Sequence, residues 1–478
     1  MENDRTPRLS PEQEAAIEVL LDAVRDKATA ALIGPAGSGK TTVVRALLNR
    51  LGSDRCVVIC PTHKARAVVS AGLPHARTAT VAATLRLRPS IDGESGQIAF
   101  KASRASADAS GFMQDGRPPA ALILDEASMV PGSSVFGLER LAERLGAALL
   151  LTGDNAQLAP VEATARGVSA AEAMAQQFVK NDRTARLETV MRTGTGPVLS
   201  LSRAIRYSPD LRAVWPTESQ HSENSRICLY AWENAWLSSA TTAFNTKDWA
   251  ADPNHARVLC WTHREAQRLA ALIRRHLHQD HDRWHPGEWL VAPSGVPQPG
   301  KALGNPIAPA CSEFQIISIQ RPQTITKATA QFTWHTPARQ QERTVRIEAT
   351  TQASVVTVQH NDKQLDLLLE PPDQLGTWSS QCKELRRIVK TKFNGSNSDR
   401  QALFRYIANL ESWIPNLRSA TTQTIHASQG SSYQHVFIAR DLRHALAADP
   451  DDAKRLAYVA VSRTRGTLHL QPLTSPDQ

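Results

Sequence analysis

Cysteines, aromatic residues and long apolar runs are all scarce in this chain of 478 residues. The six cysteines are scattered and none forms a CxxC pair, which argues against a zinc site or a dithiol redox motif and favours a reduced cytoplasmic protein. The longest apolar stretch, LGAALLLTG, is far shorter than the roughly 20 residues of a membrane span. The start, MENDRTPRLS, lacks the apolar core of a signal sequence. We expect a soluble protein without a membrane partner.

The composition is that of an ordinary globular protein, with 41% hydrophobic and 21% charged residues. A chain of this length exceeds one hydrophobic core, so we expect two main domains with inserted modules. Lysine and arginine outnumber aspartate and glutamate by 55 to 46, which gives a net charge of +9. This balance suits a protein that meets polyanions, although many basic proteins never bind nucleic acid.

The segment GPAGSGKTT, residues 34–42, has the pattern of a phosphate-binding loop. An apolar run, ATAALI, precedes it and a helical pattern, TTVVRALLNRL, follows it, so the predicted order is strand, loop, helix. Backbone N–H groups of such a loop wrap around phosphates at a helix N-terminus. Lys40 would reach the β- and γ-phosphates of ATP, and Thr41 would bind Mg²⁺. The predicted nucleotide contacts of the loop are Gly34, Pro35, Ala36, Gly37, Ser38, Gly39, Lys40, Thr41 and Thr42.

A pair of carboxylates in AALILDEAS follows another apolar run. Asp125 would hold Mg²⁺ through water, and Glu126 would orient or deprotonate the attacking water. The runs CVVICPTHKA and ALLLTGDNAQLAPV also end in polar residues. Alternating strands and helices of this kind predict a parallel sheet with its site at the strand C-termini.

Together these segments resemble the motif series of a superfamily 1 DNA helicase. The series continues with LETVMRT, VLCWTHREA, TTQTIHASQGSS and YVAVSRTRG. The spacing is most similar to the RecD-like, Dda-type branch, whose members move 5′ to 3′ on single-stranded DNA. The resemblance implies an α/β fold of two RecA-like P-loop NTPase domains with parallel sheets, an inserted pin domain and an inserted β-barrel domain.

The implied domain boundaries are residues 1–200 for the first RecA-like domain, with the pin at about 86–118. The second RecA-like domain would comprise residues 201–289 and 416–478. Between its two parts, residues 290–415 would form the β-barrel and a helical extension. Strand-like runs such as EFQIISIQ, AQFTWHT and SVVTVQH, separated by turn residues, fit such a barrel.

The resemblance also assigns roles around the nucleotide. Gln13 would read adenine, Gln157 would sense the γ-phosphate, and Gly430 would contact the nucleotide. Arg192 and Arg463 are the candidate arginine fingers, which neutralise charge on the transferred phosphoryl group. Arg465 is an alternative to Arg463. Viewed singly, the glutamines and arginines would be read as surface residues.

Contacts with DNA are expected along the backbone without reading of sequence. The resemblance places hydroxyl and imidazole donors at strand ends, and a stacking wedge on the pin; these residues are Thr62, His63, Phe100, Thr262, His263, Thr424 and His426. Phe100 is almost as well explained as a small hydrophobic plug. Trp334 and Trp378 could stack on bases, but core or loop positions suit them better.

Some positions depart from the family pattern. Ala82 replaces a histidine, Ala427 a lysine and Ser432 a frequent glutamate, which would weaken DNA or ribose contacts but not phosphoryl chemistry. A histidine-rich run, RRHLHQDHDRWH, suggests a metal site, but a solvated helix end explains it better.

Three functions fit these observations. The favoured one is a monomeric 5′ to 3′ DNA helicase, acting in the cytoplasm on the nucleoid at single-stranded DNA and at junctions with duplex. Replication, recombination and single-strand-binding proteins are candidate partners, and repair is a further candidate pathway. The second is a translocase that strips proteins from DNA with little unwinding. The third is a P-loop nucleotide switch with a protein-binding second half. RNA in place of DNA stays open.

Overall fold

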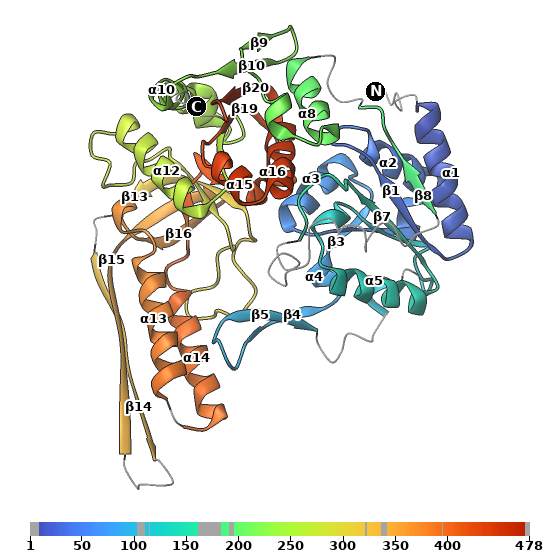
Figure 1. Cartoon of the computed structure of the whole chain (residues 1–478). Coiled ribbons are helices and arrows are strands. Elements are labelled where there is room, and N and C mark those ends of the chain that lie inside the picture. Colours follow the sequence, from blue (N-terminus) through green and yellow to red (C-terminus); the bar gives the residue numbers. More distant parts are fainter. Residues whose placement is uncertain are drawn as a thin grey trace.

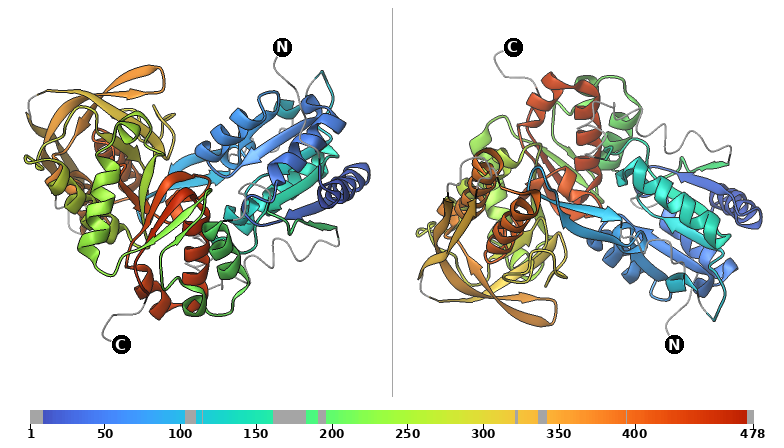
Figure 2. Two further views of the ribbon diagram at one scale, coloured as in Figure 1. Left: turned by 90° about the horizontal axis from the view of Figure 1, so that it is seen from above. Right: turned by 90° about the horizontal axis from the view of Figure 1, so that it is seen from below.

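The computed structural model describes residues 9–102, 110–113, 115–160, 183–190, 196–320, 323–335, 342–393 and 395–473. Two six-stranded sheets, each with helices on both faces, form a first and a second lobe, and a third sheet carries a pair of helices (Figure 1). Elements of the second lobe lie between the first lobe and the third sheet in both views of Figure 2. No helix of the described residues is long and apolar enough to cross a bilayer.

The sheet of the first lobe is parallel throughout. Its order is β3 (Arg77–Thr80), β2 (Cys56–Cys60), β6 (Ala121–Leu124), β7 (Ala148–Gly153), β1 (Thr29–Ile33) and β8 (Thr184–Arg186). Side chains of β7 alternate between two cores, with Leu150 in one and Leu149 in the other. Such burial on both faces explains why these strands are continuous apolar runs.

Helices cover both faces of this sheet. One core includes side chains of α1 (Pro11–Arg25), α2 (Lys40–Leu51) and α3 (His63–Gly72), and the other those of α5 (Gly132–Leu145). Helix α1 begins with a capping box, in which Ser10 accepts from the N–H of Gln13 and Gln13 accepts from that of Ser10. The short helices α4 (Val81–Thr84), η1 (Ser53–Arg55), η3 (Ser110–Phe112) and η4 (Ala127–Met129) complete the described part of the lobe.

The second lobe has a sheet of the order β18 (Thr422–Thr424), β11 (Ala256–Cys260), β19 (Tyr433–Ile438), β20 (Thr464–Leu470), β10 (Arg226–Leu229) and β9 (Gln220–His221). Only β9 of these strands is antiparallel to its neighbour. One face packs on α8 (Pro197–Tyr207), α9 (Leu211–Val214), α15 (Leu442–Ala448) and α16 (Pro450–Ser462). The other packs on α10 (Glu233–Phe244), α11 (Lys247–Ala251) and α12 (His263–Leu277). The turn η6 (His426–Ser428) follows β18.

The third sheet is antiparallel and contains β14 (Gln323–His335), β15 (Glu342–His360), β13 (Ser312–Ile319), β12 (Trp289–Ala292), β17 (Arg418–Ser419) and, paired with β15, β16 (Lys363–Leu369). The pairings of the described residues form an open path from β14 to β17, so closure into a barrel stays a prediction. After η5 (Pro372–Gln374), helices α13 (Thr377–Lys392) and α14 (Asn397–Glu411) form a core that Ala349 and Ala353 of β15 share.

A hairpin joins the first lobe to these helices. Strands β4 (Leu87–Ile91) and β5 (Ile98–Ala102) pair in the segment predicted as the pin, and the hairpin extends toward α14 (Figure 1). Gly96 in its turn has φ +70°, and a Cβ there would lie 2.5 Å from the ring of Phe404. The turn therefore requires glycine both for its backbone and for its close approach to α14.

Candidate nucleotide and nucleic-acid site

The phosphate loop joins β1 to α2 and has the geometry that its glycines predict. Gly37 and Gly39 have φ values of 81° and 86°, in the left-handed region where glycine is favoured. Lys40 begins α2, and no side chain caps that helix end, so its N–H groups are available to an anion. The Lys40 ammonium donates to the carbonyl oxygens of Gly34 (2.8 Å) and Pro35 (3.0 Å). The lysine is therefore folded back over the loop.

Gln13 supports this loop from α1. Its side chain is 4% exposed, and its amide donates to the carbonyl of Ser38 at 3.4 Å. A Cβ at Gly39 would lie 2.3 Å from the Gln13 amide nitrogen. The side-chain hydroxyl of Ser38 is buried and has no partner. Gln13 is thus placed at the loop, while its adenine contact remains a prediction.

The two carboxylates follow β6 and differ in their surroundings. Asp125 accepts a hydrogen bond from the Thr152 hydroxyl at 2.6 Å. Glu126 has φ 50°, and one of its carboxylate oxygens is buried without a partner. Burial raises the pKa of Glu126, and Asp125 raises it further, whereas Lys40 and Arg463 lower it. A carboxylate in such a position can take up a proton, which is what the predicted role of Glu126 requires.

Unpartnered buried groups test whether the site fits a nucleotide with its metal. Ser38, Glu126 and Gln157 each have a buried polar atom without a hydrogen bond. Natural proteins leave few such groups, and each calls for an explanation such as a missing ion or ligand. Thr41 is exposed at the start of α2. The residue set therefore fits a triphosphate and a hard divalent cation, which prefers oxygen ligands.

The segment GDNAQLAP after β7 belongs physically to both lobes. Gln157 is 2% exposed, and its backbone carbonyl accepts from Arg455 of α16 at 2.9 Å. Leu158 is buried in the core of the second lobe with residues of α8 and α16. The segment that follows β7 of the first lobe is thus anchored in the second lobe.

Arg463 ends α16 and is 6% exposed. Its guanidinium donates to the Ser431 and Val459 carbonyls, both at 3.2 Å, and its charge lowers the pKa of Glu126. A second-lobe arginine therefore acts electrostatically on a first-lobe carboxylate. Arg465 is exposed and donates to the carbonyl of Asn254 at 3.4 Å.

Two further predictions concern this region. Gly430 has φ +76°, and a Cβ there would lie 3.9 Å from the Cβ of Ala65 on α3. It is therefore close to the first lobe, while its nucleotide contact remains a prediction. Arg192 lies outside the described residues.

No sequence motif predicts a role for Arg206, Arg455 and Tyr458, although all three contact the loop at Asp154 to Gln157. Tyr458 stands five residues before Arg463 in YVAVSRTRG, which is the one local signal that could have drawn attention to it. Arg206 and Arg455 have no comparable signal.

The threonine–histidine pairs occupy matching positions in the two lobes. Thr62 caps α3 by accepting from the N–H of Ala65 (3.1 Å), and Thr262 caps α12 by accepting from that of Glu265 (3.2 Å). The histidines that follow, His63 and His263, are exposed at the first position of each helix. Helix N-termini favour anions, so both pairs suit phosphates of a nucleic acid backbone.

The remaining predicted DNA contacts fall into exposed and buried groups. Thr424 is 6% exposed and accepts from the N–H of Ala427 at 3.3 Å. Burial lowers the pKa of nearby His426, which favours a neutral imidazole. Phe100 is 63% exposed on β5, so its stacking role stays a prediction and a buried plug is excluded.

The two tryptophans have different outcomes. Trp378 is 1% exposed in the core of α13 and α14, and its indole donates to the carbonyl of Leu410 at 3.2 Å, so the favoured core position is confirmed and stacking on bases is excluded. Trp334 lies in β14, in a stretch whose side chains are outside the described part.

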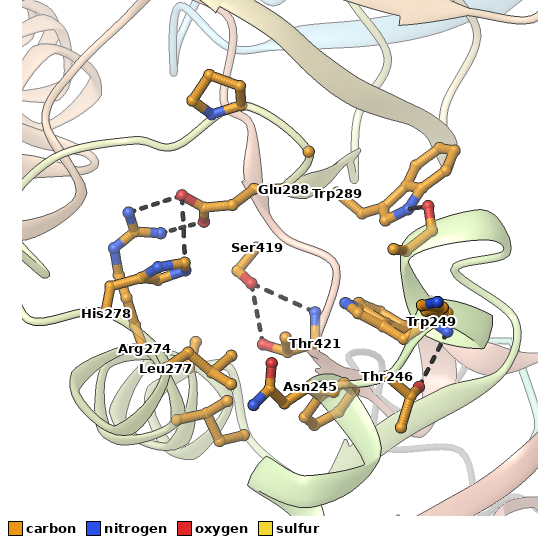
Figure 3. A pocket seen from close by; sticks show the side chains of 17 residues that line it. Asn245, Thr246, Trp249, Arg274, Leu277, His278, Glu288, Trp289, Ser419 and Thr421 are labelled. Atoms are coloured by element: carbon orange, nitrogen blue, oxygen red, sulfur yellow. Dashed lines mark hydrogen bonds and ion pairs between the residues drawn. The ribbon is translucent and has the colours of Figure 1, made fainter.

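The histidine-rich run lines part of a pocket away from the phosphate loop (Figure 3). The pocket has a volume of about 440 Å³, with Trp249 and Trp289 on one side and an ion pair of Arg274 and Glu288 on the other. His278 stacks on His285, with ring centroids 4.1 Å apart. No group of three or more potential metal ligands occurs in the described part of the chain.

An ion cluster joins the first lobe to the third sheet. Glu313 of β13 lies 2.8 Å from a nitrogen of Arg257, which is fully buried in β11, and 3.6 Å from the ammonium of Lys64 on α3. Lys64 directly follows the Thr62–His63 pair, so this contact reaches the predicted DNA-binding edge.

A phosphate loop with paired carboxylates on one parallel sheet, together with an arginine at the end of a helix that packs on a second, mostly parallel sheet, defines a P-loop ATPase with two RecA-like lobes. Residues 8–218 match the family model of an AAA domain, and residues 419–471 match that of the UvrD-like helicase C-terminal domain. The chain therefore carries an AAA domain and a UvrD-like helicase C-terminal domain, and it is an ATPase of the helicase class.

Solved structures of Pif1 helicases are similar to this chain. One, described as showing DNA unwinding at forked dsDNA by two coordinating Pif1 helicases, has 14% identity and a TM-score of 0.49, with 97% of this chain and 92% of that chain covered. A Bacteroides Pif1 in complex with ADP-AlF3 and ssDNA has 14% identity and a TM-score of 0.47, with the same coverage of both chains. Pif1 from Candida albicans has 14% identity and a TM-score of 0.40, with 97% of this chain and 95% of that chain covered. A search of curated proteins found no match.

Proposed function

We propose that the chain is an ATP-driven DNA helicase of the RecD-like branch, which moves 5′ to 3′ along single-stranded DNA and separates duplex at junctions. The observation that carries this proposal is the placement of charge across the lobes. Lys40 of the first lobe and Arg463 of the second both act electrostatically on Glu126, which follows β6 of the first lobe. Such an arrangement makes the contact between lobes depend on what the loop holds.

Within this proposal the chain's own residues divide the work. The loop N–H groups and Lys40 bind the phosphates of ATP, and Thr41 and Asp125 hold Mg²⁺, which when bound supplies charge neutralisation. Glu126 takes a proton from water, and Arg463 stabilises charge on the transferred group. Gln157 lies next to the second lobe and suits a sensor of the γ-phosphate.

For nucleic acid, the two threonine–histidine pairs offer one phosphate-binding helix end in each lobe. If the lobes approach and separate with each ATP, the two helix ends change their spacing along the strand. The exposed Phe100 on the hairpin is the proposed wedge at a junction. Replication, recombination or single-strand-binding proteins are proposed as partners.

The decisive experiment compares ATPase rates with single-stranded DNA, duplex DNA and RNA, followed by strand displacement on duplexes with a 5′ or a 3′ tail. We expect stimulation by single-stranded DNA and displacement from the 5′ tail. Displacement of bound streptavidin without strand separation would favour a nucleoprotein remodeller. An ATPase rate indifferent to every nucleic acid would favour a nucleotide switch.

A further inference from the structure

The hydroxyl of Tyr458 lies where parts of both lobes meet. It donates to a carboxylate oxygen of Asp154 at 2.7 Å. It accepts from the backbone N–H of Ala36, in the phosphate loop, at 3.2 Å and from the guanidinium of Arg206, also at 3.2 Å. A tyrosine hydroxyl has one proton to donate and two lone pairs to accept with. Each of its bonding positions is therefore used, and its direction is fixed.

These groups come from separate segments that the hydroxyl joins. Asp154 follows β7, whereas Arg206 and Tyr458 lie on α8 and α16, which pack together in the second core. Tyr458 is 2% exposed and Asp154 is fully buried. Asp154 also pairs with Arg206 and accepts from the N–H of Ala156 at 3.0 Å. Hydrogen bonds to a buried charge are among the strong ones, and losing a partner there is costly.

The Lys40 side chain must move when the phosphate loop binds a phosphate. Lys40 now donates to the carbonyls of Gly34 and Pro35, so it has to leave them to reach an anion. Ala36 is the next residue, and its N–H is held by Tyr458. Helix α16 continues from Tyr458 to Arg463 at its end. Any shift of Ala36 on phosphate binding would therefore act on the helix that carries Arg463.

We propose that Tyr458 is a positioning residue that couples the conformation of the phosphate loop to helix α16. This inference rests on the proposed function, because it concerns the response of the second lobe to nucleotide. It concerns a group that has no direct contact with the reacting atoms. Its role is to make Arg463 respond to the state of the loop.

The test uses the full-length chain with Tyr458→Phe, which keeps the ring and removes the hydroxyl. The matched control is Tyr433→Phe. Tyr433 is fully buried in the same core, and its hydroxyl accepts from the amide of Gln423 at 2.6 Å. If Tyr458→Phe does not fold, Asp154→Asn takes its place, since it keeps the shape of the anchor and weakens it.

The first measurement is amide hydrogen exchange with and without ADP and Mg²⁺. We expect ADP to slow exchange in the phosphate loop of all three proteins. In the wild type and in Tyr433→Phe it should also slow exchange in residues 450–462, by roughly tenfold or more. In Tyr458→Phe that second response should be lost. An equal response of residues 450–462 in Tyr458→Phe and wild type, or no such response in the wild type, would overturn the inference.

The second measurement separates kcat from KM for ATP. Tyr458→Phe should lower kcat by about tenfold while KM changes by less than about threefold, because the loop still binds but Arg463 is poorly placed. Equal kcat values for the two phenylalanine variants would indicate a packing role alone. A wild type that no nucleic acid stimulates would count against the proposed function, whereas the exchange response to ADP judges Tyr458 independently.

Discussion

Five strands follow the same order in the sheets of the first and second lobes, and only the edge strands β8 and β9 differ, but the two lobes carry different chemistry. When the sheets are matched by position, β1 corresponds to β10, β2 to β11, β6 to β19 and β7 to β20. Strand β1 leads into the glycine loop and the uncapped helix α2. Strand β10 leads instead to Trp232, which is 68% exposed and precedes α10 without capping it through its side chain. A shared scaffold thus holds phosphate on one side and supplies an arginine on the other, so function resides in the loops.

One position is alike in both lobes. Strands β2 and β11 each end in cysteine, then one residue, then a capping threonine and a histidine. The lobes are therefore alike at these strand ends and different at the phosphate loop. Substitutions can test the similarity and the difference separately.

The largest effect is expected from the contribution of the second lobe. Arg463→Ala should lower the ATPase rate by about 10³-fold, because an arginine finger is worth roughly 10³ to 10⁵. The rate is measured at saturating ATP. Arg465→Ala is the control and should retain activity, since its guanidinium is exposed. A larger loss for Arg465 than for Arg463 would mean that the wrong arginine has been assigned.

The second-largest effect is expected from Lys40 of the first lobe. Lys40→Ala should reduce ATP hydrolysis by about 10²- to 10³-fold through loss of charge stabilisation. Its counterpart at the start of α10 is Glu233, which pairs with Arg268 at the surface. Glu233→Ala should leave hydrolysis unchanged. Comparable losses for both would remove the functional contrast between the lobes.

Stability should depend on pH through the second sheet. Burial, and to a smaller extent His435, lowers the pKa of His469 from 6.5 to about 3. The unfolded chain binds a proton below pH 6.5 while the folded one does not, so stability is full above that pH and is lost as pH falls. We expect a loss of about 1.4 kcal/mol by pH 5.5 from this residue. Denaturant unfolding at pH 7.5 and 5.5 should show a smaller loss for His469→Gln, and an undiminished loss would place the sensitivity elsewhere.

The smallest effects concern the two helix caps. Thr62→Ala should cost about 1 kcal/mol of unfolding free energy. Thr262→Ala should cost more, because Thr262 also donates to a carboxylate oxygen of Asp441 at 3.2 Å. Denaturant unfolding gives the stability, and titration with fluorescent single-stranded DNA gives the affinity. Serine at either position should restore the cap. Equal costs would show that the Asp441 contact adds nothing.

Local patterns predicted the parts of the site that depend on neighbouring residues. The positive φ values of Gly37 and Gly39, the cap of Thr62 and the strand before Asp125 follow from short segments. The sequence could not show that Tyr458 bonds to Ala36, because these residues are 422 positions apart. The sequence could not predict the contact between Glu313 and Lys64 for the same reason. Long-range pairs depend on how sheets and helices pack, and single-sequence periodicity carries no such information.

The third sheet shows a second limit. Alternating and apolar runs predicted its strands, and strands occur there, but the register and the open path of pairing depend on contacts between distant segments. For Trp378 the sequence favours a core or loop position over stacking on bases, but it does not identify which residues surround the ring. Its indole bonds to Leu410 inside a helical core, a fact that only the packing of α13 on α14 reveals.

The burial of Leu158 in the core of the second lobe limits where the protein can be divided into fragments. A fragment that ended after the first lobe would present this leucine and the neighbouring Ala156 to water. We therefore expect such a fragment to self-associate. Adding a second fragment that contains α8 and α16 should cover Leu158 and prevent this self-association. Limited proteolysis should likewise spare this segment, although it looks from the sequence like an ordinary connecting loop.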